Sequence, residues 1–109
     1  MFLIPLMLII FCNGFVVNIF WTKHAKERFE ERALLYGFTR TEIEEIIKKQ
    51  EVRIDQGFDN KYRKQKFQTI GQITGQFFTI EKAEDKKEIF VITLWESKES
   101  EKRIWCSKK

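Results

Sequence analysis

The sequence is poor in the residues that build metal centres, disulfide frameworks and phosphate-binding loops. Its 109 residues include two cysteines and one histidine, and neither cysteine has a second cysteine or a histidine at the spacing of a zinc ligand pair. Two cysteines also cannot form the dense disulfide framework of small secreted domains. The five glycines are scattered and form no phosphate-cradling loop. We therefore expect neither a metal nor a cofactor.

Charge is absent from the start of the chain, and this divides the sequence into two parts. All Asp, Glu, Lys and Arg residues lie from Lys23 onward. The chain carries 20 basic and 16 acidic side chains, and its residues are 43% apolar and 33% charged. These proportions are typical of a globular domain, and the length leaves room for one domain.

The uncharged segment has two interpretations. Residues 1–21 are nearly long enough to cross a bilayer, which takes about 20 apolar residues, and the basic residues that follow would then favour the cytoplasmic side. Alternatively, the β-branched and aromatic run Phe15–Trp21 is the first strand of a domain, preceded by the turn signal Asn13-Gly14.

The second interpretation gives a division of the chain. Residues 1–14 become a hydrophobic extension that serves as an anchor, a signal or a non-functional leader, and residues 15–109 form one α+β domain. A dozen apolar residues are too few to span a bilayer. We expect a cytoplasmic protein, with membrane association through residues 1–21 as the open alternative.

Two helices are predicted after this segment. Thr22 can cap a helix that buries Ala25, Phe29 and Ala33, spaced four residues apart, and that ends near Gly37. The second helix is predicted over residues 40–50. Its signals are a capping box of Thr39 and Glu42, a hydrophobic staple of Phe38 and Ile43, and an apolar stripe of Ile43, Ile46 and Ile47.

The hydrophobic period changes from helical to alternating after Glu51, which indicates strands. We predict strands over residues 52–54, 66–70, 76–82 and 88–95, a loop around residues 55–57 and 59–60, and hairpin connections over residues 71–75 and 83–87. Ser97 can cap a last helix that runs through Arg103. The predicted fold is α+β, with two N-terminal helices packed on an antiparallel sheet of three to five strands and a short C-terminal helix.

Three groups of cationic side chains are candidates for contacts with phosphate. Metal-free cleavage of RNA needs groups that move protons at the 2′- and 5′-oxygens and cations that stabilise the charge on phosphorus. An imidazole near its ordinary pKa can move such protons, and an aromatic ring can stack on a base. The groups are His24, Arg28 and Arg32 on one helix flank; Tyr62, Arg63, Lys64 and Lys66; and Lys98, Lys102 and Arg103.

Each group also has an ordinary structural interpretation. The two arginines of the first group can pair with Glu27 and Glu31 on the same helix. The second group can be a solvated loop, because residues 53–66 carry a modest net charge. The aromatic residues Phe77, Phe78, Phe90 and Trp95 stand at strand spacing and are expected in the core.

The sequence resembles a known family in two segments. HAKERFEER from His24, followed by the capped helix at Thr39, resembles small bacterial domains that open with His-Ala-x-x-Arg-x-x-x-Arg. Residues 66–105 resemble the C-terminal half of BrnT-type toxins, in which an R-f-x-x-i-G-x-x-x-G hairpin leads to a strand ending in Ser-Ala-Arg and then to a Glu-containing basic helix. Lys66 stands in place of the first Arg, and Thr93-Leu94-Trp95 in place of Ser-Ala-Arg, while Glu101 and Arg103 match.

The resemblance covers residues 20–105 and implies a RelE-like fold and a ribonuclease toxin of a type II toxin-antitoxin system. We expect metal-independent cleavage of RNA and an antitoxin protein as partner. The predicted catalytic residues are His24, Arg28, Arg32 and Lys66, and the predicted RNA-binding residues are Arg63, Lys64, Lys98, Lys102 and Arg103. The alternative is a non-catalytic binding module of the same fold, tethered to a membrane or not.

Overall fold

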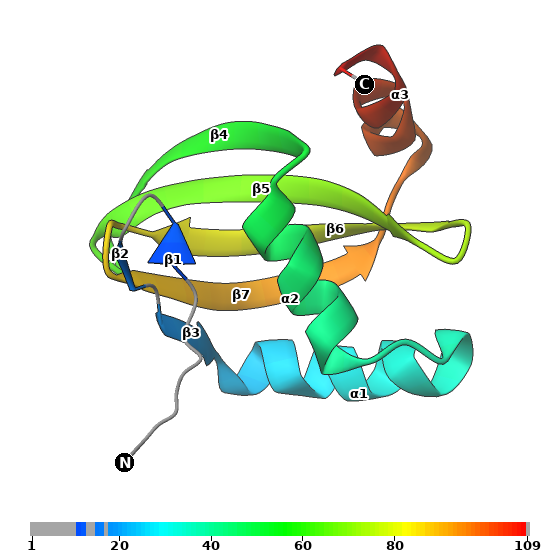
Figure 1. Ribbon diagram of the computed structural model, residues 1–109, viewed down its shortest axis with the longest axis horizontal. Coiled ribbons are helices and arrows are strands. Elements are labelled where there is room, and N and C mark those ends of the chain that lie inside the picture. Colours follow the sequence, from blue (N-terminus) through cyan, green and yellow to red (C-terminus); the bar gives the residue numbers. More distant parts are fainter. Residues whose placement is uncertain (1–10, 13–14, 17, 109) are drawn as a thin grey trace.

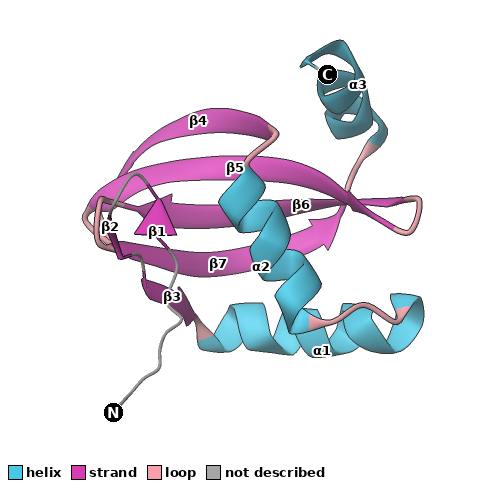
Figure 2. Cartoon of the chain, in the orientation of Figure 1, coloured by secondary structure: helices cyan, strands magenta, loops and turns pink. Residues whose placement is uncertain are grey.

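The computed structural model describes residues 11–12, 15–16 and 18–108. Two helices, α1 and α2, lie on one face of a five-stranded sheet, and a third, α3, stands at one end of the sheet (Figures 1 and 2). The elements are β1 (Phe11–Cys12), β2 (Phe15–Val16), β3 (Asn18–Trp21), α1 (Lys23–Tyr36), α2 (Arg40–Lys49), β4 (Val52–Asp59), β5 (Lys64–Ile73), β6 (Gln76–Glu84), β7 (Glu88–Glu96) and α3 (Glu99–Lys108). The α+β class is therefore confirmed.

The sheet is mixed, with the strand order β3-β7-β6-β5-β4. Three hairpins join β4 to β7, and each of these neighbouring pairs is antiparallel. The edge strand β3 pairs with β7 in parallel, so the prediction of a fully antiparallel sheet is wrong for this pair. A parallel pair needs a crossover connection, and α1 and α2 begin that crossover by carrying the chain from β3 to the far edge at β4.

The helix boundaries follow from their capping residues. The amide of Ala25 donates to the Thr22 hydroxyl at 3.1 Å, and Gly37 ends α1 in the left-handed conformation with φ 74°. In α2, the amide of Glu42 donates to the Thr39 hydroxyl and the amide of Thr39 donates to the Glu42 carboxylate. Both predicted helices are confirmed.

One core lies between these helices and the sheet. Its fully buried members include Ala25 of α1, Ile43 and Ile47 of α2, and Phe78 and Ile80 of β6. The helix α2 also approaches β5 closely, because a Cβ at Gly71 would lie 2.6 Å from the Ile46 side chain. Gly71 is therefore a strand residue under a helix, and the prediction that places it in a hairpin connection is wrong.

The hairpins are tighter than predicted. The β5–β6 turn consists of Thr74 and Gly75, with φ 45° and 86°, values that suit the two-residue turn of a twisted hairpin. The predicted loop around residues 55–57 is instead a bulge inside β4, where the amide of Gly57 donates to Asp55 Oδ1 at 2.8 Å. The turn at Asp59 is confirmed, since Asp59 Oδ1 accepts the amides of Lys61 and Tyr62.

The N-terminal segment is only partly described. The predicted strand over residues 15–21 is two strands, β2 and β3, and β1 pairs with β2 so that Cys12 lies opposite Phe15. Most of the predicted extension, with the Asn13-Gly14 turn signal, lies outside the described residues. Within the described ranges, every helix is too short or too polar to cross a membrane.

The helix α3 packs against the sheet face opposite α1 and α2. Glu101 accepts the Thr79 hydroxyl at 3.1 Å, and the Trp105 ring lies edge-on to Phe77 with 5.0 Å between centroids. The predicted cap at Ser97 is wrong, because the Ser97 hydroxyl bonds to Thr79 and the amide that Glu101 accepts at the helix start belongs to Lys98. The predicted end at Arg103 is also too early, since α3 continues to Lys108.

Candidate nucleic-acid interface

The candidate site lies on the sheet face that α1 and α2 do not cover. Because side chains alternate between the two faces of a strand, the register assigns each residue of β6 to one face. Phe78 and Ile80 point into the core, and Thr79 and Glu81 point to the opposite side. The part of this opposite side that extends from α3 to the β4–β5 turn is called the open face. Its strand residues are Phe20, Lys64, Lys66, Gln68, Glu81, Phe90 and Thr93.

Three aromatic rings form a row on the open face. The centroids of Phe20 and Phe90 are 5.4 Å apart at an interplanar angle of 31°, and those of Tyr62 and Phe90 are 5.7 Å apart at 29°. Phe20 is 44% exposed, and the other two rings are half-buried. Phe90 therefore departs from the prediction that it belongs to the core. The row packs ring against ring, with Phe90 between Phe20 and Tyr62, and Phe20 is its most exposed member.

Lysine ammonium groups lie beside these rings. Lys64 Nζ lies 5.4 Å from the centroid of Phe90, and Lys61 Nζ lies 5.4 Å from the centroid of Tyr62. Both distances are within the range of a cation–π contact. Cationic and aromatic groups thus alternate along this end of the open face.

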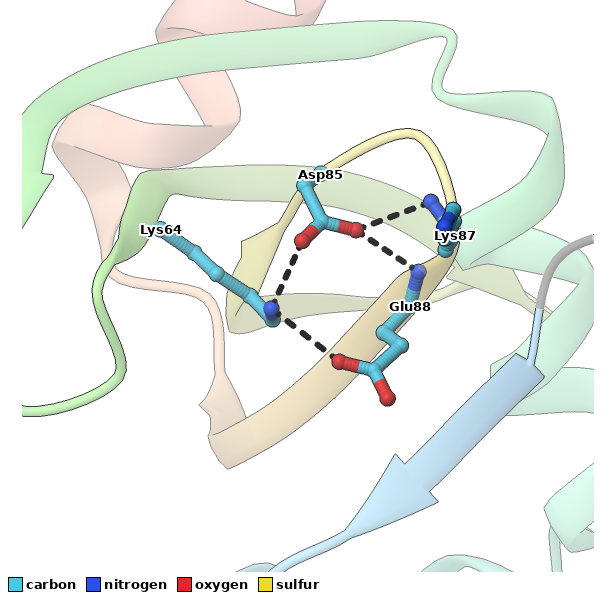
Figure 3. A network of polar contacts seen from close by, with 4 residues as sticks. All are labelled: Lys64, Asp85, Lys87 and Glu88. Atoms are coloured by element: carbon cyan, nitrogen blue, oxygen red, sulfur yellow. Dashed lines mark hydrogen bonds and ion pairs between the residues drawn. The ribbon is translucent and has the colours of Figure 1, made fainter.

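Lys64 is held by two carboxylates (Figure 3). Its ammonium lies 2.7 Å from Asp85 Oδ2 and 3.1 Å from Glu88 Oε1. The Asp85 carboxylate also accepts the amides of Lys87 and Glu88 at 2.8 and 2.9 Å. The hydrogen bond from Lys64, followed by those two amides, lowers the pKa of Asp85 to about 2. In return, Asp85 and then Glu88 raise the pKa of Lys64, so both charges persist at neutral pH.

Lys66 is less constrained than Lys64. Its ammonium lies 3.8 Å from Asp59 Oδ2, at the outer limit of an ion pair, and its side chain is 29% exposed. The same Asp59 carboxylate group serves the β4–β5 turn through its other oxygen. Lys66 can therefore turn toward a ligand at small cost.

The predicted helix group lies elsewhere in the molecule. His24 is exposed on α1, and Arg28 and Arg32 contact Glu31 at 3.2 and 3.6 Å. The prediction that the two arginines pair with a glutamate of the same helix is therefore confirmed for Glu31. Because α1 packs on the core side of the sheet, the structure does not bring this group together with Lys66, and the four predicted catalytic residues do not share one face.

The remaining predicted cations lie along the same side as Lys66. Arg63 is exposed in the β4–β5 turn with φ 57°. Lys98, Lys102 and Arg103 belong to α3 and the residue before it, and no ion pair engages them within the described part of the chain. Two of the three predicted groups therefore border the open face at opposite ends.

Trp95 and Glu101 meet where α3 joins the sheet. Trp95 Nε1 donates to both Glu101 carboxylate oxygens, at 3.0 and 3.1 Å, and the Lys98 amide donates at 2.7 Å. The Glu101 side chain is buried, and its three donors anchor α3. The sequence carries one local signal for this contact, a glutamate at the third position of the helix, but the pairing with Trp95 depends on the fold.

Beyond the open face, two further kinds of site come into question in the described part of the chain, a metal centre and a cavity. Among the residues that the structure describes, no group of three or more His, Cys, Asp or Glu side chains could hold a metal ion. A cavity of about 220 Å³ lies between α2 and β5, lined by Ile46 and Gly71 among others, on the core side of the sheet. In comparisons with known proteins, no family model, no curated protein and no solved structure matches the chain.

Proposed function

We propose that the protein binds single-stranded RNA on the open face and cleaves it without a metal, as a toxin of the RelE and BrnT kind that an antitoxin neutralises. The observation that supports binding is the row of Phe20, Phe90 and Tyr62 with lysines beside it. Such a row on a sheet suits unpaired bases, because every base has a π-face that can stack on an aromatic ring, worth about 1–3 kcal/mol for each base.

The geometry favours single strands over duplexes. Bases in a duplex are already stacked on one another, and a protein reads them only at their edges. The rings of the row are separated by 5.4 and 5.7 Å between centroids. Phe20 and Phe90 lie on strands of the sheet, and Tyr62 lies in the β4–β5 turn. An unpaired base can stack on an outer ring of such a row, and a base inside a duplex cannot.

The cationic side chains around the row are available to contact the phosphates of a bound strand. Lys61, Arg63 and Lys66 carry charge that is free or weakly paired, whereas Lys64 is neutralised by Asp85 and Glu88. The cations of α3 continue the basic path at the other end of the open face. A few phosphate contacts of this kind predict modest affinity that falls as salt rises.

The assignment to the toxin class depends on the sequence resemblance. The observed order of a strand, two helices, a meander of strands and a final helix is compatible with the RelE-like expectation and supports it. The partner then is an antitoxin whose acidic or amphipathic segment covers the basic groups. Toxicity and the antitoxin are the parts of this proposal that growth experiments test directly.

A second function is favoured by one observation. Lys66 lies on the open face and His24, Arg28 and Arg32 lie on α1, so the predicted catalytic set is divided, and Trp95 occupies the position of an arginine in the resemblance. This division favours a binding module of the same fold that holds RNA or a protein without cleaving it.

The binding proposal is tested with a fluorescently labelled single-stranded RNA of mixed sequence and its duplex, using polarisation. We expect the single strand to bind at least tenfold more tightly, and Tyr62→Ala to weaken binding about tenfold, equivalent to the loss of one stacked base. Phe58→Ala is the matched control, since Phe58 is 63% exposed and its partner Gln65 places it on the opposite face. Equal binding of both variants would refute the interface.

The toxin proposal is tested by expression and by incubation of the purified protein with RNA in the presence of EDTA. We expect expression of the protein to arrest growth. We also expect the purified protein to cleave RNA without a metal. Binding without cleavage would support the second function and overturn the first.

A further inference from the structure

We infer that Glu81 is the general base of the proposed ribonuclease and that Lys66 is the cation that stabilises the reacting phosphate. This inference rests on the proposed function and assigns its chemistry to the open face. None of the predicted catalytic residues supplies a proton acceptor on that face. Glu81 does, and four observations single it out.

Glu81 occupies the centre of the open face. It lies in the middle of β6, opposite Gln68 of β5 and opposite Thr93 of β7. Its side chain is half-buried, and Gln68 Nε2 donates to Glu81 Oε1 at 3.4 Å. The contact with Gln68 orients the carboxylate on β6, next to the point where the register with β7 shifts, and a catalytic group needs such positioning.

Glu81 also differs from the other carboxylates on this side of the sheet. Asp59 lies beside Lys66, and Asp85 and Glu88 hold Lys64. Glu101 is buried and accepts bonds from Thr79, Trp95 and the Lys98 amide. Within the described residues, no ion pair engages Glu81.

Lys66 is the nearest cation by register. It precedes Gln68 by two residues on β5 and so lies on the same face, diagonal to Glu81. Diagonal neighbours in an antiparallel pair are about 7–8 Å apart, within reach of long side chains. A phosphate bound between them would meet an ammonium on one side and a carboxylate on the other.

The aromatic row adjoins this pair. Phe90 lies opposite Ala83 of β6, and Ala83 lies opposite Lys66 of β5. A base stacked at the end of this row would therefore have a neighbouring sugar and phosphate near Lys66 and Glu81. This position determines which linkage of the bound strand reacts.

The reaction uses only RNA and water. The Glu81 carboxylate accepts the proton of a 2′-hydroxyl, and the 2′-oxygen forms a bond to the adjacent phosphorus. The bond between phosphorus and the 5′-oxygen breaks, and that oxygen takes a proton from water. The hydroxide left behind takes the proton back from Glu81, so the base is restored and no water is consumed. The products are a 2′,3′-cyclic phosphate and a 5′-hydroxyl, and Lys66 stabilises the negative charge that accumulates on the phosphate during the reaction.

The test compares cleavage and binding in Glu81→Gln, which keeps the shape of the side chain and removes the base. We expect single-turnover cleavage to fall at least 100-fold, the usual contribution of a general base, while RNA affinity changes less than threefold. The rise of the wild-type rate with pH should be lost in the variant. Lys66→Ala should weaken both steps, and Lys66→Arg should restore them in part.

The control is Glu45→Gln, an exposed glutamate of α2 on the other side of the molecule, which should cleave like the wild type. Circular dichroism and thermal melting verify that each variant is folded. Wild-type cleavage by Glu81→Gln would overturn this inference and leave the proposed function standing. A wild-type protein that binds RNA but does not cleave it would overturn the inference and retain the interface, and one that does not bind would overturn both.

Discussion

The two faces of the sheet differ in what their aromatic side chains contact. On the face under α1 and α2, Phe78 is fully buried and packs edge-on against Phe38, with 4.8 Å between ring centroids. On the open face, Phe20, Tyr62 and Phe90 stack on one another and remain partly in solvent. These partly exposed rings beside charged groups are the feature on which the proposed interface rests. The covered face therefore supplies the packing that stabilises the fold. The open face is the one on which we propose that a ligand binds.

Among variants that distinguish the two faces, Gly71→Ala is expected to have the largest effect, a loss of stability without a loss of RNA affinity. The new Cβ would lie 2.6 Å from the buried Ile46 side chain, so that side chain or the whole of α2 has to shift away from β5. Overpacking of this kind lowers the free energy of unfolding by about 1–3 kcal/mol, which urea denaturation measures. RNA affinity of the folded fraction should not change, because the substitution lies under the helices.

Two further variants test the cause of that loss. Gln72→Ala, at the next and exposed residue of β5, should stay within about 0.5 kcal/mol of the wild type. Combining Gly71→Ala with Ile46→Ala should cost less than the sum of the two, because the smaller side chain makes room for the methyl group. Strict additivity would show that the contact does not limit the approach of α2.

A smaller effect is expected from Asp85→Asn, which perturbs the open face. The pKa of Asp85 is lowered from 3.8 to about 2 in the folded protein, so its charge stabilises the fold above pH 4 and this contribution is lost as pH falls from 4 toward 2. The Asp85 side chain is half exposed and screened by solvent, so the variant should lose about 1 kcal/mol or less at pH 7.

The measurement is urea unfolding of both proteins between pH 7 and pH 3. The difference between them should shrink below pH 4, since the unfolded chain then takes up a proton at Asp85 that the folded protein, with its lowered pKa, takes up only near pH 2. A difference that does not depend on pH would assign the loss to the backbone contacts of the loop instead of the Lys64 ion pair.

Local signals in the sequence are sufficient for the two helices of the covered face. Thr22, Gly37 and the Thr39–Glu42 capping box each act within a few residues, and their geometry is confirmed. The predicted β5–β6 turn is too long because Thr74 adopts a positive φ, which a threonine rarely does and which no local pattern indicates. The parallel pairing of β3 escapes prediction because it joins residues about 70 positions apart.

The open face is predictable only in part. Lys64 and Lys66 are close in sequence, and their proximity to Tyr62 follows from it. The aromatic row also needs Phe20 from β3 and Phe90 from β7, which only the long-range pairing of those strands brings together. Glu81 gives no signal, because a glutamate in a strand is ordinary until its cross-strand neighbours Gln68 and Thr93 are known.

The smallest effect is expected from the triple variant His24→Ala, Arg28→Ala, Arg32→Ala. These side chains belong to α1 on the covered face, and both arginines already contact Glu31. RNA affinity should change less than twofold. The matched double variant Arg63→Ala, Lys66→Ala also removes two arginine or lysine charges. It should weaken binding and make the slope of log affinity against log salt shallower by about 0.7 for each phosphate that the protein no longer neutralises.

Polarisation titrations at several salt concentrations compare these two variants directly. Equal loss of affinity in both would mean that RNA crosses the β3 edge from the open face to α1, and the distinction between the faces would fail. The same triple variant separates two accounts of catalysis, since it lacks His24 and retains Glu81. If it cleaves at the wild-type rate, proton transfer takes place on the open face; if cleavage is abolished while binding is kept, the imidazole on α1 is the group that moves the proton.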